Sequence, residues 1–394
     1  MSILKRIMLV ICIVFLLVSV NCFSVSSEVL ANEEDNIAKI MKQLGIPSIS
    51  AGIIKNNSIV WYKGYGHYDK FFRRKPTVNT NYLAGSTSKA VTATALMQLY
   101  EQGKFDLDDD VNDYLPFSLR NPNYPDEPIT FRMLLSHQSS LSEPGLKGEI
   151  IGNIAYMFRC FEKYLVPGER WYDSSFWTTD HPGEAFNYSN LGFGILGYLV
   201  EILSGESFNE YCKTRIFEPL EMYNTSFKLR DLRRSNIIVP YIGGKRIILR
   251  LPRYSVPISP AGGLITSVEE LSHFLIAHMN NGTYNGVRLL ENSTVELMHT
   301  IQYPAEGYPK DPSIWPTNCQ YGLGWMFMND SGTMYQGHPG TTIGSHCRMK
   351  YSESDKTGII IFDNYYTLDM EKAKLLAQAC NSISEELFKI ADGL

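Results

Sequence analysis

The chain has 394 residues, of which 44% are hydrophobic and 20% charged, a composition typical of a globular protein with enough apolar surface for a core. Its 36 Lys and Arg residues nearly balance 41 Asp and Glu residues, so the formal net charge is only −5 at pH 7. We find no extended basic block and therefore expect no nucleic-acid partner.

The first residues predict a targeting segment rather than a part of the fold. Lys5 and Arg6 precede an apolar run over residues 7–20, which is shorter than the ~20 residues that span a bilayer. A positive start followed by a short apolar run is typical of a secretory signal, and Val29 and Ala31 supply small residues for cleavage after Ala31. Because the apolar run lies far from that position, a retained N-terminal anchor is the alternative.

Residues 1–31 are therefore assigned to a signal peptide or an N-terminal anchor. Either assignment predicts an exported protein, secreted or anchored in a membrane and facing outside the cytoplasm. On this interpretation the protein meets a membrane only through the anchor.

No metal or other cofactor is expected. The cysteines beyond residue 31 are scattered and show no C-x-x-C pair, so neither a zinc site nor a disulfide scaffold is indicated, although one disulfide in an oxidising compartment is left open. Asp106, Asp108 and Asp110 resemble the start of a calcium loop. Val111 and Phe117, however, stand where such a loop needs Gly and Glu.

The predicted elements change character along the chain. Residues 35–44 predict a short helix, the runs 48–54 and 59–65 predict a β-hairpin, and residues 90–102 predict a helix that Gly103 ends. Further helices are expected after Thr130, at 191–203 and 208–217, and after Ser267 and Ser293; strands at 321–328, 333–336, 345–350 and 358–363; and a closing helix at 369–388.

Strands thus occur at both ends of the mature chain, with a mostly helical insertion at about 105–250 between them. We expect an α+β fold in which one antiparallel sheet is built from both ends of the chain and is flanked by helices.

The strongest local signal is Gly85-Ser86-Thr87-Ser88-Lys89, placed where a loop enters a helix. Residues three apart share a helix face, so Ser86 and Lys89 can meet, with Ser86 at the positive N-terminal end. A Ser hydroxyl is a weak nucleophile until a base takes its proton. A partly desolvated Lys has a lowered pKa and can be that base. Alone, this S-x-x-K pattern is weak, because chance copies are common.

Two later segments carry candidate side chains. Residues 182–190 form a turn into a helix, and Tyr188 and Asn190 lie where both can project into one cleft; the plainer interpretation is that Ser189 or Asn190 caps the helix. Residues 337–344 read G-H-P-G-T-T-I-G, before or within a strand, and the glycines allow a substrate backbone to come close. An ordinary turn or bulge is the plainer interpretation there.

In this order, S-x-x-K, Tyr-x-Asn and His-x-Gly resemble the serine β-lactamase and penicillin-binding-protein superfamily, most closely its class C-like branch of DD-peptidases, D-amino-acid peptidases and esterases. The stretches 129–137, 260–267 and 321–325 also resemble that family. The resemblance covers nearly all of the chain after about Asn36. It implies a β-lactamase/transpeptidase-like fold and makes residues 32–394 one serine hydrolase domain.

The resemblance also implies the catalytic roles. Ser86 attacks the substrate carbonyl, while Lys89 and Tyr188 take its proton and later protonate the leaving group; which of the two is the base is left open, because their titrations are coupled. The backbone N–H groups of Ser86 and Thr341 form the oxyanion hole.

The substrate site is implied to include Asn190, which hydrogen-bonds a substrate amide, together with His338, Gly340 and Thr341. Here the chain departs from the family's β-lactamases, whose third motif usually begins with Lys followed by a hydroxyl residue. His338 carries little charge at neutral pH, and Pro339 has neither a hydroxyl nor an N–H. A site for a substrate carboxylate is therefore weakened.

Two more features have a functional and a structural interpretation. Trp171, Tyr172, Phe176 and Trp177 form an aromatic cluster that either lines the substrate pocket or packs as a satellite core. His137, within the family-like stretch 129–137, is expected to make a structural hydrogen bond.

We expect a serine hydrolase that acts on D-residue peptides or amides or on small esters. Its partner is then a small-molecule or peptide substrate, with cell-wall peptides among the candidates. A β-lactamase is the alternative that His338 and Pro339 disfavour. A non-catalytic penicillin-binding sensor or scaffold is disfavoured because Lys89 and Tyr188 are both present.

Overall fold

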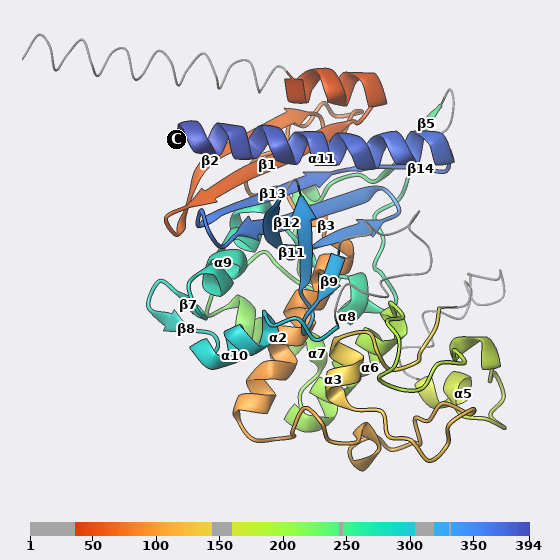
Figure 1. Cartoon of the computed structure of the whole chain (residues 1–394). Coiled ribbons are helices and arrows are strands. Elements are labelled where there is room, and N and C mark those ends of the chain that lie inside the picture. Colours follow the sequence, from red (N-terminus) through yellow and green to blue (C-terminus); the bar gives the residue numbers. More distant parts are fainter. Residues whose placement is uncertain (1–35, 144–159, 244–246, 304–318, 331) are drawn as a thin grey trace, which may run out of the picture.

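The computed structural model describes residues 36–143, 160–243, 247–303, 319–330 and 332–394, which adopt an α+β fold (Figure 1). The predicted signal peptide or anchor, residues 1–31, lies outside the described residues.

A seven-stranded antiparallel sheet, in the order β2-β1-β13-β12-β11-β10-β9, forms the centre of the fold. Its strands are β1 (Ser48–Lys55), β2 (Ser58–Gly66), β9 (Cys319–Tyr321), β10 (Met326–Asp330), β11 (Thr333–Thr342), β12 (Ser345–Ser352) and β13 (Thr357–Asp363). Because β1 from the start of the described chain pairs with β13 from its end, the predicted sheet from both ends is confirmed.

The expected hairpin is present as β1 and β2. Its two turn residues, Asn56 and Asn57, have φ angles of 52° and 60°. Both therefore lie in the left-handed region that a two-residue type I′ turn requires and that Asn tolerates.

Helices cover both faces of the sheet (Figure 1). On one face, α11 (Met370–Gly393) lies across the strands, and its Leu376, Ile383 and Leu387 share a buried cluster with Ile359 and Ile361 of β13. The other face meets α9 (Val268–Met279) and α2 (Ser88–Glu101).

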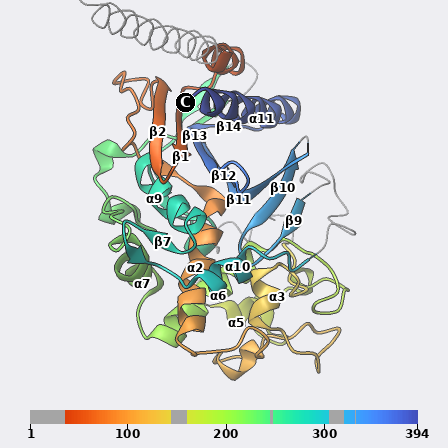
Figure 2. The ribbon, with the colours of Figure 1, turned by 60° about the vertical axis from the view of Figure 1, so that its left-hand side comes forward.

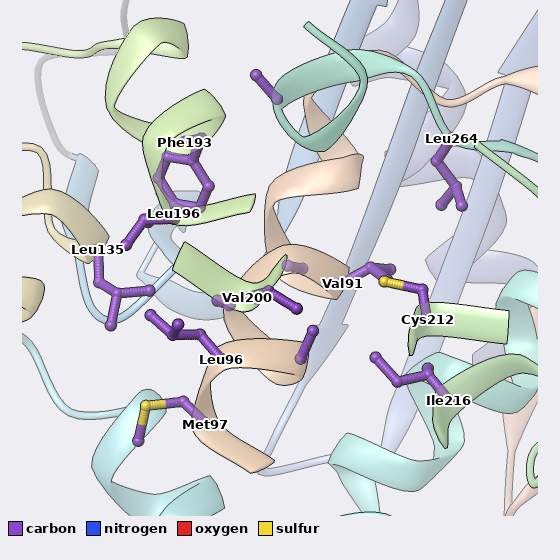
Figure 3. Packing of buried hydrophobic residues seen from close by; sticks show 14 of the residues in the cluster. Val91, Leu96, Met97, Leu135, Phe193, Leu196, Val200, Cys212, Ile216 and Leu264 are labelled. Atoms are coloured by element: carbon purple, nitrogen blue, oxygen red, sulfur yellow. The ribbon is translucent and has the colours of Figure 1, made fainter. Parts of the chain in front are cut away.

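The helical part of the molecule packs around α2, which is buried on nearly every side. Its main neighbour is α6 (Asn190–Ser204). Figure 3 shows Leu96 and Met97 of α2 lying with Leu196 and Val200 of α6 in the main core. This burial explains why α2 has the apolar composition of a core helix rather than one apolar stripe.

The shorter elements connect these layers. They are β3 (Tyr82–Leu83), η1 (Gly85–Thr87), η2 (Val111–Asp113), α3 (Phe131–Leu135), α5 (Phe161–Leu165), η3 (Ser174–Phe176), α7 (Phe208–Cys212), η4 (Lys213–Phe217), η5 (Leu229–Asp231), η6 (Arg234–Asn236), β4 (Tyr241–Gly243), β5 (Ile248–Arg250), α8 (Ser259–Gly262), β6 (Ile265–Thr266), β7 (Thr283–Tyr284), β8 (Val287–Arg288), α10 (Asn292–Met298) and β14 (Tyr365–Thr367).

The single strand expected at 321–328 was wrong, because the chain turns there between β9 and β10. The Gly322 N–H donates to the Trp325 carbonyl over 2.8 Å, and Gly324 has a φ of +77°. A Cβ on Gly324 would lie 2.4 Å from the Cβ of Ala93, so the turn packs directly on α2. The following strand, β11, is longer than expected and contains the third motif.

The aromatic cluster belongs to the main hydrophobic core: Phe176 and Trp177 are buried in it, and Trp171 and Tyr172 pack against it. The packed interpretation of that cluster is therefore confirmed. The thiols of Cys160, Cys212, Cys347 and Cys380 are free.

None of the described helices is by itself long and apolar enough to cross a membrane. The helices Asn190–Ser204 and Phe208–Phe217 reach that length and composition only when they are counted together, and the chain bends by 80° between them.

Candidate active site

Ser86 lies in η1, the short turn that leads directly into α2. The preceding residue, Gly85, has a φ of +55°, and a Cβ there would lie 2.6 Å from the backbone nitrogen of Thr341. The turn is therefore pressed against the third-motif strand, and only Gly fits at this position.

Lys89 is fully buried one turn farther along and directs its ammonium group back at Ser86. Its Nζ lies 3.1 Å from Ser86 Oγ, 2.8 Å from the Ala261 carbonyl oxygen and 2.5 Å from Asn190 Oδ1. Burial lowers the pKa of Lys89 from 10.5 to about 7, and the negative charge of Glu143 opposes part of that shift. Near neutral pH a large share of Lys89 is thus uncharged and able to accept a proton.

Tyr188 lies beside both groups, with its ring centroid 4.7 Å from Lys89 Nζ. Burial raises the pKa of the Tyr188 phenol well above its usual value, and a hydrogen bond with Ser86 lowers it only in part. The phenol therefore stays protonated at neutral pH, and it can donate or relay a proton more readily than it can act as a phenolate base.

His137 supports the Tyr188 turn. Its buried ring lies 4.2 Å from the Tyr188 ring, centroid to centroid, and its Nδ1 accepts the backbone N–H of Ser189 over 3.1 Å. The expected structural hydrogen bond of His137 is confirmed. Ser189 caps α6 by accepting the Gly192 N–H over 3.0 Å. The same turn therefore caps the helix and positions Tyr188 and Asn190, which flank Ser189.

Asn190, the first residue of α6, joins Lys89 to Glu143. The Asn190 amide nitrogen donates to Glu143 Oε2 over 2.8 Å, and its backbone N–H donates to Glu143 Oε1. Glu143 is exposed, and its charge raises the pKa values of both Lys89 and Tyr188. An accessible carboxylate therefore lies at the edge of this group of candidate catalytic side chains.

The third motif closes the opposite side of the site. A Cβ on Gly340 would lie 1.9 Å from the Ala84 carbonyl oxygen and 2.8 Å from the Ser86 nitrogen. Together with the close approach of Gly85 to Thr341, this packing places the turn that contains Ser86 directly against the strand that contains Thr341, as an oxyanion hole shared by their backbone N–H groups would require.

His338 is fully buried, and both ring nitrogens bind within the chain. Its Nδ1–H donates to the Pro339 carbonyl over 2.7 Å, and its Nε2 accepts the Tyr321 hydroxyl over 2.9 Å. Burial, with the nearby Lys89 charge, lowers the pKa of His338 to about 3. His338 is therefore uncharged at neutral pH and offers no charge to a substrate carboxylate. This agrees with the expectation drawn from the presence of His where the family's β-lactamases have Lys.

A cavity of about 390 Å³ adjoins the outer face of β11. Thr341 and Pro339 line it together with Arg348, which stands opposite Pro339 on β12, and with residues of β14 and α11. Among the described residues, no carboxylate lies within ion-pair distance of Arg348. The neighbouring His346 is paired with Asp363 at 3.0 Å.

The structure thus brings Ser86, Lys89, Tyr188, Asn190 and the third motif together, from η1, α2, the turn into α6, and β11. Sequence reasoning missed Glu143, the Ala261 carbonyl and the Tyr321 hydroxyl. Ala261 and Tyr321 lie in stretches that resembled the family, so their positions carried a signal, whereas nothing in the pattern around Glu143 pointed to the site. In the part of the chain described, no three His, Cys, Asp or Glu side chains are grouped as metal ligands.

Comparison with known proteins finds related sequences and related structures. Protein flp of Staphylococcus aureus (strain N315) is 26% identical over 321 residues, which are 81% of this chain and 60% of that protein, so the chain spans about three fifths of the length of this relative. The octameric penicillin-binding protein homologue from Pyrococcus abyssi superposes with a TM-score of 0.70 at 28% identity, covering 85% of this chain and 73% of that one.

D-amino acid amidase from Ochrobactrum anthropi SV3 shares the fold, with a TM-score of 0.68 at 18% identity over 91% of this chain and 99% of that one. The Beta-lactamase family model matches residues 34–377, nearly the whole of the described chain. The chain therefore belongs to the beta-lactamase family, as the order of its three motifs predicted.

Proposed function

We propose that this protein is a serine amidase or peptidase that forms an acyl-enzyme on Ser86 and prefers substrates with a free ammonium group on a D-residue. The observation that carries the proposal is the placement of Lys89 Nζ, with a pKa of about 7, at 3.1 Å from Ser86 Oγ. A base near the operating pH and within hydrogen-bond reach is what activation of a hydroxyl nucleophile requires.

In acylation, neutral Lys89 takes the Ser86 proton as Oγ bonds to the substrate carbonyl carbon. The oxyanion that forms is held by the N–H groups of Ser86 and Thr341. The C–N bond then breaks, and the proton on Lys89 passes through the Tyr188 phenol to the leaving amine. In deacylation a water gives its proton to the same pair and attacks the ester, and Ser86 is reprotonated as the acid product leaves.

The charges around the site favour a cationic acyl group. Glu143 supplies an exposed carboxylate two hydrogen bonds from Lys89, while His338 stays neutral. A charge-assisted hydrogen bond contributes roughly 1.5–3 kcal/mol, so an ammonium that reaches Glu143 is expected to gain about 10- to 150-fold in kcat/KM. The shared fold with a D-amino acid amidase supports the same substrate class.

A second candidate, a D-peptidase that releases a residue with a free carboxylate, rests on Arg348. Arg348 lines the 390 Å³ cavity together with Thr341, on the α11 side of β11, and its guanidinium also donates to the Ala377 carbonyl over 3.5 Å. A leaving-group carboxylate in this cavity would pair with Arg348, whereas an amide substrate that releases ammonia would not use it.

Kinetics on matched substrates test both candidates. We expect D-alanine amide to exceed both L-alanine amide and N-acetyl-D-alanine amide in kcat/KM, and Glu143→Gln to erase the difference between the free and the acetylated amine. Arg348→Gln should lower kcat/KM for the dipeptide D-Ala-D-Ala and leave the amide unchanged if the protein is a D-peptidase. Turnover of a chromogenic cephalosporin far above every amide, dipeptide and p-nitrophenyl ester would show a β-lactamase instead.

We also propose that the protein acts outside the cytoplasm. The basis is the basic start and short apolar run in residues 1–31, which lie outside the described structure. Fractionation of the native host should place the protein in the envelope or the medium, and full-length protein in the cytosol would contradict the proposal.

A further inference from the structure

An unusual surface loop follows β2. Six successive residues, 70–75, read Lys-Phe-Phe-Arg-Arg-Lys, and all six are exposed. Phe71 is 77% exposed and Phe72 is 60% exposed, and they are among the most exposed large apolar side chains described. Four cations thus surround two exposed aromatic rings in a chain whose net charge is −5.

Hydrogen bonds to neighbouring side chains fix the conformation of this loop. Asp69 is buried, and its Oδ1 accepts the N–H groups of Phe71 over 3.1 Å and of Phe72 over 3.2 Å. Asp69 also forms a β-bridge with Arg74. The Lys70 N–H donates to the Tyr241 hydroxyl over 2.9 Å. The two rings are therefore exposed because the hydrogen-bonded turn directs them away from the protein.

The two rings contact each other, not the core. Their centroids are 4.8 Å apart in an edge-to-face arrangement, and the Arg74 guanidinium lies 5.5 Å from the Phe72 centroid. Neither ring contributes to the buried clusters, so the two rings together form an exposed apolar surface of the kind that marks interaction sites.

The neighbouring strand β5 also carries basic and exposed apolar side chains. Arg250 of β5 reaches Asp69 at 3.4 Å, so β5 lies beside the loop, and its neighbours Ile247 and Leu249 are 65% and 57% exposed. The structure also contains an N-terminal helix over residues 36–44, as the sequence predicted for 35–44. Gly66, just before the loop, packs on Pro47 and on Met41 of that helix, so the loop and the helix lie at the same end of the molecule (Figure 2).

We propose that residues 70–75 are a membrane-surface contact that seats this end of the protein on an anionic lipid bilayer. Aromatic side chains favour the headgroup level of a bilayer, and Lys and Arg beside them are attracted to anionic lipids. The charge complementarity selects this occupant. The apolar run at 7–20, which follows Lys5 and Arg6, would also hold the chain at a membrane if residues 1–31 are the retained anchor and not a cleaved signal peptide. Residues 70–75 would then be a second membrane contact beside that anchor, and the only one of the two that remains after cleavage of a signal peptide.

Partitioning of the full-length chain into vesicles tests the proposal, because the N-terminal segment contributes equally in every variant. With vesicles of 70% phosphatidylcholine and 30% phosphatidylglycerol, Phe71→Ser/Phe72→Ser should lower the partition coefficient on the order of 10-fold or more. Lys70→Gln/Arg73→Gln/Lys75→Gln should lower it on anionic vesicles but not on pure phosphatidylcholine. Ester turnover should stay unchanged in both, since none of these residues lies at the active site.

Tyr223→Ser is the matched control, because Tyr223 is 72% exposed elsewhere on the surface and should have no effect. A Phe71→Trp variant reports directly: its emission should shift to the blue on anionic vesicles and be quenched by brominated lipid. Equal partitioning of the wild type and the double Phe variant, or an unshifted and unquenched emission from the Phe71→Trp variant, would overturn the lipid contact.

Discussion

At the scale of single residues, the chemistry depends on the charge state of Lys89. Burial works against the ammonium form, while Glu143 supports it, and the balance leaves the pKa of Lys89 at about 7. Tyr188 is buried too, yet burial moves its pKa upward and keeps it neutral. The two groups that the resemblance could not separate are thus driven in opposite directions by the same desolvation, which favours Lys89 as the base.

The pH dependence of kcat/KM should show this balance. Lys89 must be uncharged to act as the base, so activity should fall below about pH 7 as Lys89 becomes protonated. Glu143→Gln removes a negative neighbour that stabilises the protonated form, so the pKa of Lys89 should fall and the acidic limb should move to lower pH. Glu184→Gln, an exposed acid in the turn before Tyr188, should leave the limb in place. An unmoved or upward-moving limb in Glu143→Gln would contradict the assignment.

Lys89→Ala and Tyr188→Phe should act on the chemical step. We expect kcat to fall by roughly 10²–10⁴-fold, the usual range for a proton-transfer group, with little change in KM. Steady-state kinetics on an activated ester separate the two parameters. A loss confined to KM would show that these side chains only hold the substrate.

The sequence predicted contacts between residues of one short motif, but it missed contacts between residues that only the tertiary structure brings together. Ser86 and Lys89 are three apart on one helix, so their contact follows from helix geometry. Asn190 could be placed near a cleft, but its bridge between Lys89 and Glu143 connects three separate segments. No local pattern around Glu143 encodes that meeting.

At the scale of elements, the site depends on the packing of η1 against β11. Two glycines, Gly85 and Gly340, remove the side chains that would hold these backbones apart. The turn η1 and the strand β11 therefore approach closely, as the proposed oxyanion hole of the Ser86 and Thr341 backbone N–H groups requires. The resemblance located this strand motif, but its position inside a ten-residue strand, β11, became clear only in the structure.

Gly340→Ala should disturb this contact strongly. The added Cβ would lie 1.9 Å from a carbonyl oxygen of the backbone, so η1 and β11 must separate. Acylation should fall by roughly 10²–10³-fold, the cost of losing one oxyanion-hole donor. Gly393→Ala is the control, since a Cβ there meets no atom within 4 Å. Burst kinetics with a p-nitrophenyl ester measure acylation directly, and an undiminished burst in Gly340→Ala would exclude the oxyanion-hole geometry.

Local signals explain which elements were predicted well. The Asn-Asn turn set the β1–β2 hairpin, and Ser189 with Gly205 set the two ends of α6. The break between β9 and β10 was missed, because its cause is the contact of Gly324 with Ala93 of α2, which lies far away in sequence.

At the scale of the whole molecule, the two ends of the described chain are joined in one sheet. β1 pairs with β13 from Ile49 to Lys55, and α11 covers this junction on the outer face. The alternation of strand and helix signals predicted a sheet from both ends with helices between. The strand order itself came only with the structure, because nothing local specifies which of the C-terminal strands lies next to β1.

Leu387→Ala tests how far stability depends on this junction. Leu387 is fully buried among Ile359, Ile361 and Ile383, so the truncation should lower the free energy of unfolding by about 2–5 kcal/mol. Leu375→Ala, on the exposed side of the same helix, should change it by less than about 0.5 kcal/mol. Urea unfolding followed by circular dichroism gives both values, and equal effects would mean that α11 does not stabilise the sheet as packed.

The central claim is that Ser86 carries the acyl group. Intact mass and peptide mapping after reaction with a fluorophosphonate probe, and separately with a fluorescent penicillin, test it most directly. We predict one adduct per chain, on the peptide that contains Ser86, and no adduct on Ser86→Ala protein whose circular dichroism matches the wild type. An adduct on another residue, or undiminished labelling of Ser86→Ala, would contradict the account.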